Sequence, residues 1–242
     1  MKTLRLMTSF ALFGATAVAQ VPWSNGKLVV SSNGRYLQHA NGQPFFWLAD
    51  TCWLLSQKLD RAQVENYFEN RKAKGFNVVQ CVVVQMLNDK NAYEDAALVE
   101  GDLLRLAITP GSNPSNAAEY DYWDHFDYIV ETAAANGIYL AVAPTWSHTV
   151  RRAPVTKAQA ESYAATLAKR YRTKPNIIWL NGGSARGNEN TDVWQTIGET
   201  IKEHAPDHLM TFHPFGRTSI VDVVSAGALA RSEHVHVRTS SL

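Results

Sequence analysis

The chain has 242 residues and a formal net charge of +1, with 45% hydrophobic and 19% charged residues. This composition predicts one folded domain and argues against disorder. The near-neutral charge gives no electrostatic reason to expect nucleic acid or an acidic membrane as a partner. Seven Trp residues are available as large core side chains or as platforms for sugar rings.

The N-terminus has the pattern of an export signal. Lys2 and Arg5 precede an apolar stretch over residues 6–18, which is too short to span a bilayer. Ala17-Val18-Ala19 then matches the small-x-small cleavage pattern, so we expect residues 1–19 to be removed and Gln20 to begin the mature chain. The predicted location is secreted or periplasmic.

An exported location bears on the two cysteines, Cys52 and Cys81. Oxidising compartments permit a disulfide between them. Sequence does not show whether they lie close enough, and two buried free thiols fit equally well.

Short strands are predicted first, at 28–30, 36–39 and 45–48, separated by Asn-Gly turns. Asp60 and Gln63 then form a capping box for a helix that runs to Lys74 and ends at Gly75. Further helices are predicted at 121–136, 156–172 and 191–204. Nearly continuous apolar segments predict buried strands at 76–84, 138–143, 176–180 and 208–212.

Alternating strands and helices with short connections predict a parallel sheet, with 45–48 as its first strand. The fold class is α/β, and the favoured architecture is a (β/α)8 TIM-type barrel. Such barrels usually take ~250 residues or more, so about five of eight βα units are expected here. A doubly wound open sheet is the alternative, although no Gly-rich nucleotide loop follows any predicted strand.

The segments that follow the predicted strands are rich in polar and aromatic residues. In barrels the chemistry lies at these carboxyl ends, and such side chains suit a sugar: amides and carboxylates bind hydroxyls, and indoles cover the apolar ring face. The candidate substrate-binding residues are Asp50, Trp53, Gln85, Trp146, Asn181, Arg186 and His213.

Several of these residues also have structural interpretations. Asp50 could cap a turn, Trp146 could fill the barrel mouth, and His213 could be a hydrogen-bonded core histidine. A metal site using His148, His213 and Asp50 lacks HxH or HExxH spacing, so no metal or cofactor is expected. A Ser-His-Asp hydrolase using Ser184 lacks the Gly-x-Ser-x-Gly elbow.

Six segments together resemble the apiosidase-like family of glycoside hydrolases, at residues 46–53, 74–80, 122–130, 143–146, 174–183 and 208–214. The resemblance runs from about Val21 to Thr218. It implies a (β/α)8 barrel and hydrolysis of glycosidic bonds in plant cell-wall polysaccharide. For characterised relatives it implies release of apiose-containing side chains from pectin. The implied partner is therefore a carbohydrate.

The chain departs from the family pattern at the implied catalytic pair. The family has Gly-Gly-Asp after the fourth strand, and that Asp is the acid/base; the matching residue here is Ser184. Losing a general acid costs ~10²–10⁴-fold in rate. Nothing in the sequence positions the neighbouring Glu189 as a substitute. The family's nucleophile, a late Glu, is expected beyond the part of the barrel predicted here, and a retaining glycosidase needs both carboxyl groups.

These observations predict a secreted, truncated glycoside hydrolase of impaired activity, with residues 20–218 as a partial barrel. The alternatives are a catalytically silent carbohydrate-binding barrel and a structural barrel. Residues 219–242 have no strand or helix period. Reading their codons one base later can place Trp opposite Leu229 and continue a family-like sixth strand, so we expect a frameshifted, poorly structured tail.

Overall fold

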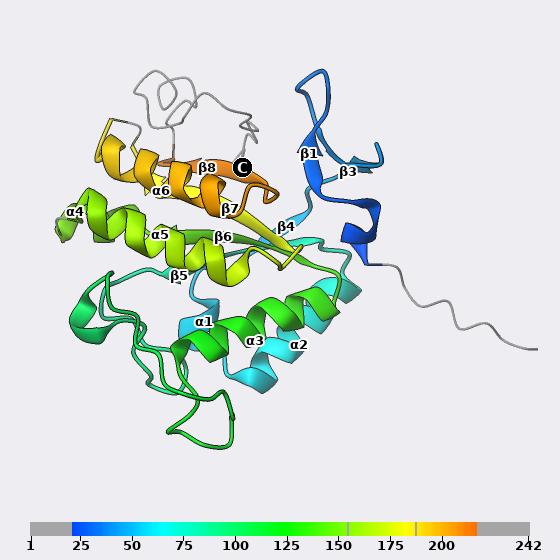
Figure 1. Ribbon diagram of the computed structural model, residues 1–242. Coiled ribbons are helices and arrows are strands. Elements are labelled where there is room, and N and C mark those ends of the chain that lie inside the picture. The colour runs from blue at the N-terminus through cyan, green and yellow to red at the C-terminus, as the bar shows by residue number, and fades with distance from the viewer. Residues whose placement is uncertain (1–20, 154, 187, 217–242) are drawn as a thin grey trace, which may run out of the picture.

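The computed structural model describes residues 21–153, 155–186 and 188–216. The predicted signal peptide and the predicted frameshifted tail lie outside the described residues. Two sheets are present in the described part (Figure 1). The first is antiparallel, with strands β1 (Leu28–Val30), β2 (Leu37–His39) and β3 (Pro44–Phe45), in the order β1-β2-β3.

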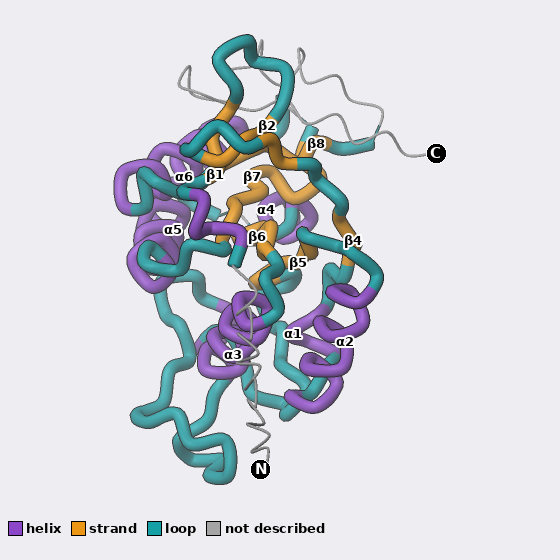
Figure 2. The backbone as a smooth tube through the Cα atoms, turned by 90° about the vertical axis from the view of Figure 1, so that its right-hand side faces the viewer, coloured by secondary structure: helices purple, strands orange, loops and turns teal. Residues whose placement is uncertain are grey.

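The second sheet is parallel and has five strands in the order of the chain. They are β4 (Ala49–Thr51), β5 (Val78–Val84), β6 (Tyr139–Thr145), β7 (Ile177–Ala185) and β8 (Met210–Pro214). The strand order never reverses, which excludes a doubly wound sheet. The strands form an arc with the helices around its outside (Figure 2). The predicted incomplete (β/α)8 barrel is confirmed.

The described helices are α1 (Leu55–Lys58), α2 (Arg61–Ala73), α3 (Tyr122–Ala135), α4 (Ser147–Arg152), α5 (Lys157–Tyr171) and α6 (Thr191–His204). Two 3-10 turns, η1 (Pro22–Asn25) and η2 (Val99–Gly101), complete the set. The predicted capping box of Asp60 and Gln63 is confirmed, with both reciprocal hydrogen bonds present. None of the described helices has the length and apolarity needed to cross a membrane.

The prediction of a first barrel strand at 45–48 is wrong. Its first residue belongs to β3, which pairs with β2, and the parallel sheet begins only at Ala49. Between them, the Asn77 side chain replaces the ladder: it accepts a hydrogen bond from the Leu48 N–H (2.9 Å) and donates one to the Phe46 carbonyl (2.6 Å). An apolar run therefore resembled a strand although a side chain supplies two of its hydrogen bonds. As a consequence, Asp50 lies inside β4 rather than after a strand.

The parallel sheet has apolar residues on both faces. Its outer face packs against the helices through residues such as Val79, Leu140 and Trp179. Its inner face is a separate cluster formed by Val78, Val82, Tyr139, Ala141, Ala143, Ile178 and Leu180. Burial on both faces explains why these strands are nearly continuous apolar segments.

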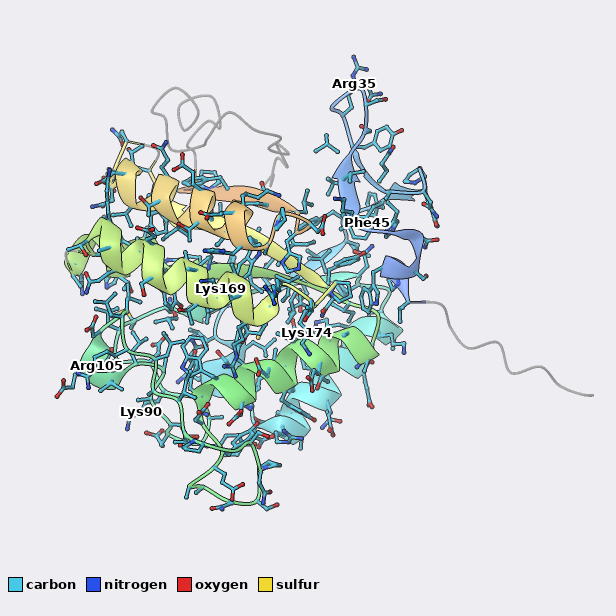
Figure 3. All side chains as sticks on the ribbon, in the orientation of Figure 1. Arg35, Phe45, Lys90, Arg105, Lys169 and Lys174 are labelled. Carbon is cyan, nitrogen blue, oxygen red and sulfur yellow. The ribbon has the colours of Figure 1, made fainter. Side chains whose placement is uncertain are left out.

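The antiparallel sheet packs at the amino ends of the parallel strands, opposite α4 (Figure 1). Trp23 and Phe45 contact Tyr139 edge-on, with ring centroids 5.5 and 5.4 Å apart. Figure 3 labels Phe45 where this sheet meets the rest of the molecule. Residues of η1 and β3 therefore pack over the amino end of the inner face.

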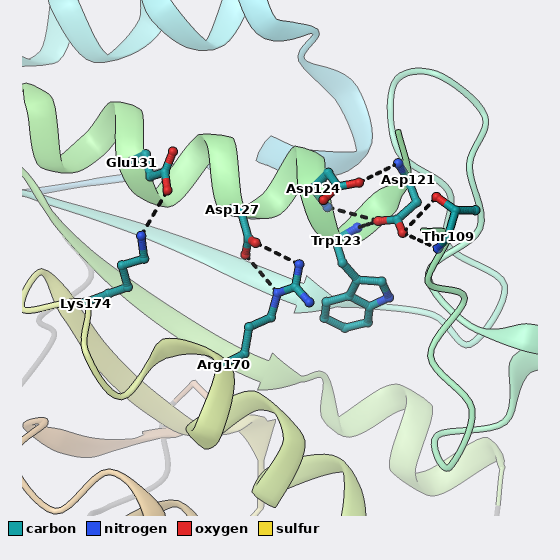
Figure 4. A network of polar contacts seen from close by, with 8 residues as sticks. All are labelled: Thr109, Asp121, Trp123, Asp124, Asp127, Glu131, Arg170 and Lys174. Atoms are coloured by element: carbon teal, nitrogen blue, oxygen red, sulfur yellow. Dashed lines mark hydrogen bonds and ion pairs between the residues drawn. The ribbon is translucent and has the colours of Figure 1, made fainter. Parts of the chain in front are cut away.

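Ion pairs fix neighbouring βα units to one another on the outside of the arc (Figure 4). Arg170 of α5 donates two hydrogen bonds to Asp127 of α3, at 2.9 and 2.7 Å. Lys174 pairs with Glu131 of α3 at 3.0 Å. Bidentate Arg–carboxylate geometry is the most specific form of such a pair, so α3 and α5 are held in one orientation.

Candidate active site

Three aromatic side chains meet at the carboxyl ends of the parallel strands. Trp53 follows β4, Trp146 follows β6 and His213 lies near the end of β8. Ring centroids are 4.8 Å apart for Trp53–Trp146, 5.1 Å for Trp53–His213 and 5.6 Å for Trp146–His213. We call these three residues the upper aromatic cluster. The structure thus brings together three of the predicted site residues.

Ser184 reaches this cluster because β7 bulges near its end. The β7–β8 register shifts between Asn181 and Ala185, and Gly182, Gly183 and Ser184 have φ of 98°, 41° and 66°. A Cβ atom on Gly182 would lie 2.4 Å from the Phe212 ring, and one on Gly183 would lie 2.4 Å from the Thr145 carbonyl oxygen. Only glycine permits this close approach.

The bulge places Ser184 against His213. The Ser184 N–H donates to His213 Nδ1 at 3.2 Å, and the Ser184 hydroxyl oxygen is 3.4 Å from the same nitrogen. Ser147 at the start of α4 donates its hydroxyl to the Ser184 carbonyl at 3.0 Å. Sequence reasoning missed Ser147, although its position directly after Trp146 was a usable signal.

Burial lowers the pKa of His213. Its Nδ1 accepts the Ser184 N–H, which leaves the proton of the neutral ring on Nε2. The Nδ1 lone pair is therefore occupied and does not serve as a base for the Ser184 hydroxyl. This geometry does not support the Ser-His-Asp alternative.

Asp50 is not part of this arrangement. Its carboxylate accepts hydrogen bonds from the Tyr67 hydroxyl (2.8 Å) and from Arg71, both on α2. Burial alone would raise the pKa of Asp50, but the bonds from Arg71 and Tyr67 lower it. The expectation that Asp50 faces the same cleft as His213 is therefore not met, since its carboxylate braces α2 against β4. The i, i+4 spacing of Tyr67 and Arg71 places both on one face of α2.

The Asn181 side chain is also engaged by the scaffold. It is buried, donates to the Trp194 carbonyl of α6 at 2.7 Å and accepts the Gly182 N–H at 2.9 Å. With both ends of the amide occupied, Asn181 holds α6 against the bulge. Gln85 is half-buried at the end of β5, and its carbonyl accepts a hydrogen bond from the Thr149 hydroxyl of α4.

Charged residues from the end of α4 and from the segment after β7 pair with one another. Glu189 lies between two arginines, 3.7 Å from Arg186 and 3.8 Å from Arg151. The Arg186 guanidinium also lies 5.0 Å from the centre of the Phe215 ring. Sequence analysis found nothing that positions Glu189, and the structure corrects this: two guanidinium groups hold it. Both arginine side chains are at least half exposed, so these groups are open to a ligand.

A cavity of about 360 Å³ opens at the carboxyl end of the strands, between α4 and the segment after β5. Its walls combine apolar residues such as Met86 and Leu87 with the polar side chains of Asn88, His148 and Arg152. Among the described residues, no group of three His, Cys, Asp or Glu side chains is placed to hold a metal ion.

The comparisons with known proteins agree with this architecture. Residues 31–237 match the family described as Apiosidase-like, catalytic domain. The chain belongs to this family. The match continues past Thr218, where sequence analysis ended the resemblance, into the segment expected to be frameshifted. The frameshift stays a prediction that resequencing decides.

Two solved structures are similar to this apiosidase-like chain at substantial identity. One is titled glycoside hydrolase, with 42% identity and a TM-score of 0.75. The other is a glycoside hydrolase family 5 protein from Bacteroides vulgatus ATCC 8482, with 41% identity and a TM-score of 0.76. Each comparison covers 82% of this chain but only 43% and 42% of the other. This chain thus spans less than half the length of either.

An endo-1,4-beta-mannanase from Rhizomucor miehei shares the fold at 16% identity, with a TM-score of 0.59 over 83% of this chain and 66% of that one. At this identity the likeness concerns the barrel alone. No curated protein matches the chain.

Proposed function

We propose that this apiosidase-like chain is exported and recognises plant cell-wall polysaccharide of the pectic, apiose-containing kind, and that it hydrolyses it weakly. The observation that carries the proposal is Ser184 beside His213 of the upper aromatic cluster. The resemblance assigns the family's acid/base to this position, and here a serine faces the neutral imidazole of His213.

The cluster is suited to binding a sugar ring. Trp53 and Trp146 offer indole faces to the C–H groups of the ring, and no described residue hydrogen-bonds to Nε2 of His213, which could donate to a hydroxyl. Arg186 and Glu189 supply donors and acceptors for further hydroxyls. These groups support the proposed binding of a sugar.

Within the described residues, the site has no comparable arrangement for hydrolysis. A serine hydroxyl does not protonate a glycosidic oxygen at neutral pH, and without a general acid we expect a rate ~10²–10⁴-fold lower. Asp50 faces α2, and Glu189 is ion-paired with arginines. These observations favour a second candidate, a catalytically silent carbohydrate-binding barrel.

Turnover and binding should be measured on the same purified, folded sample. We expect apiose-containing pectic fragments to bind in calorimetry, while chromatography shows release at least ~10²-fold slower than with a full-length relative that has the Asp. A comparable rate would refute the impaired-hydrolase proposal. Slow release with binding leaves the impaired enzyme, and complete absence of release with binding selects the silent barrel. Failure to bind any pectic fragment would refute both.

Export is a separate part of the proposal. The charged start, the apolar segment and Ala17-Val18-Ala19 support removal of residues 1–19. We expect N-terminal sequencing of the exported product to begin at Gln20. A product that retains Met1 would contradict this.

A further inference from the structure

Cys52 and Cys81 lie at facing positions on adjacent strands. The β4–β5 ladder pairs Thr51 with Gln80, and the Cys52 N–H donates to the Gln80 carbonyl at 2.9 Å. The next residue along each strand is a cysteine. Neighbouring strands lie about 4.8 Å apart, which is within the range of Cα–Cα distances found in disulfides.

The two thiol groups also share one face of the sheet. The side chains of Thr51 and Gln80 hydrogen-bond to each other at 3.2 Å. Because successive side chains of a strand alternate between faces, the cysteines that follow lie together on the opposite face. Consistent with this, Cys81 is buried in the helix-side core and half-buried Cys52 packs against the same core. Both thiols are free in this structure.

We infer that Cys52 and Cys81 are an oxidisable pair whose disulfide fastens β4 to β5. The oxidant is a small disulfide, RSSR, such as oxidised glutathione. The Cys52 thiolate attacks RSSR, which forms a mixed disulfide and releases RS⁻. The Cys81 thiolate then attacks the Cys52 sulfur and releases the second RS⁻. Two protein thiols are oxidised and one RSSR is reduced to two RSH. The two protons of the protein thiols are taken up by the two RS⁻ groups.

The order of the steps follows from exposure. Cys52 is the more accessible thiol and reacts first, whereas Cys81 is 1% exposed and reacts in the second step. Burial raises the pKa of both thiols, and the nearby Asp50 carboxylate adds to the rise at Cys52. Both are therefore protonated at neutral pH, so oxidation should be slow there and faster at higher pH.

The bond has a structural consequence. β4 is a three-residue strand at one edge of the parallel sheet, and the residue after Cys52 is Trp53 of the upper aromatic cluster. A link at Cys52 would hold this edge strand, and with it the start of the Trp53 segment, against β5. By closing a loop of about 30 residues, it should raise Tm by roughly 5–10 °C.

The test is to incubate the folded chain with oxidised glutathione at pH 8 and to count thiols afterwards in denaturant. We expect loss of both thiols, a monomer lighter by two hydrogen atoms, a cross-linked peptide containing residues 52 and 81, and the rise in Tm. Two single variants are matched controls. Cys81→Ser should stop at a glutathione adduct, and Cys52→Ser should stay unmodified while folded.

Three outcomes would overturn the inference. The wild-type chain could stop at a glutathione adduct on Cys52, could form only intermolecular disulfides, or could form the internal bond only in urea. Each would show that the folded strands do not bring the two sulfur atoms together. The experiment uses no glycan, so its result is independent of the proposed function.

Discussion

The inner face of the sheet has an aromatic group at each end, and the two groups differ in their surroundings. At the amino end, Trp23 and Phe45 contact Tyr139 edge-on, and Phe45 belongs to β3 of the antiparallel sheet. We call these three residues the lower aromatic cluster. At the carboxyl end, the upper aromatic cluster has similar ring spacings but hydrogen-bonds to Ser184.

The comparison shows that aromatic rings alone do not define a sugar site. In both clusters the centroids of contacting rings lie 4.8–5.6 Å apart. In the lower one, Trp23 and Phe45 pack against Tyr139, which is only 2% exposed. In the upper one, His213 accepts a hydrogen bond from the Ser184 N–H. Polar partners, rather than the number of Trp residues, distinguish the candidate site.

Each end also has a histidine that accepts a hydrogen bond at Nδ1. At the amino end, His208 accepts from Trp179 Nε1 at 3.1 Å, and burial lowers its pKa to about 4. At the carboxyl end, His213 accepts from the Ser184 N–H, and burial lowers its pKa as well. Both rings are neutral at pH 7. His208 is hydrogen-bonded to a core side chain, Trp179, whereas His213 is hydrogen-bonded to Ser184 at the candidate site.

The largest expected effect is on stability, from Tyr139→Ala in the lower aromatic cluster. Removing this buried ring should lower the free energy of unfolding by about 3–5 kcal/mol, measured by urea titration. Tyr139→Phe is the control: within the described structure the hydroxyl has no hydrogen-bond partner, so its loss should cost almost nothing. If both variants were equally unstable, the ring would not be the stabilising part.

Local patterns account for what the sequence predicted. Capping residues such as Asp60, the glycines after helices and doubly buried strands are all read within a few residues, and the corresponding elements are confirmed. What was missed is non-local. Asp50 turns to α2 because of Tyr67 and Arg71, which are 17 and 21 residues away. The Asn181 amide is occupied by Trp194 of the following helix.

The second prediction concerns His208 and the stability of the protein in acid. Above pH ~6.5, His208 is neutral in both the folded and the unfolded chain and has no effect. Below that, the unfolded chain binds a proton that the folded chain with its pKa of about 4 excludes. The free energy of unfolding should therefore fall as pH drops, by about 3 kcal/mol at pH 4.

Urea titrations between pH 7.5 and 4 test this. His208→Gln removes the titrating group, and its side-chain oxygen can still accept from Trp179 Nε1. The pH dependence of this variant should be flatter than that of the wild type. Parallel curves would show that His208 is not responsible.

A third prediction tests the upper aromatic cluster by binding. Trp146→Ala should weaken binding of a pectic fragment about tenfold, equal to ~1.4 kcal/mol, because it removes one stacking face. Trp146 is only half-buried, so stability should fall less than in Tyr139→Ala. Calorimetry gives the affinity. Trp146→Phe retains a ring and should recover most of it, whereas equal losses in both variants would argue against stacking.

The smallest effect on stability is expected at Ser184, where Ser184→Asp introduces the residue that the family resemblance implies. Asp adopts a left-handed φ about as readily as Ser, and residue 184 has a φ of 66°, so the free energy of unfolding should change by less than about 1 kcal/mol. The new carboxylate would lie beside His213 Nδ1 and should raise the pKa of His213, because a negative charge favours the imidazolium form. A histidine whose pKa in the folded protein rises toward its value in the unfolded chain destabilises the protein less in acid. The variant should therefore lose less stability than the wild type between pH 6.5 and 5.

NMR titration of the imidazole protons gives the pKa of His213. Ser184→Asn, of the same shape without the charge, should leave the pKa of His213 unchanged. If Asp and Asn behave alike, a carboxylate at this position does not meet the upper aromatic cluster, and residue 184 is then not the place where this family's acid belongs.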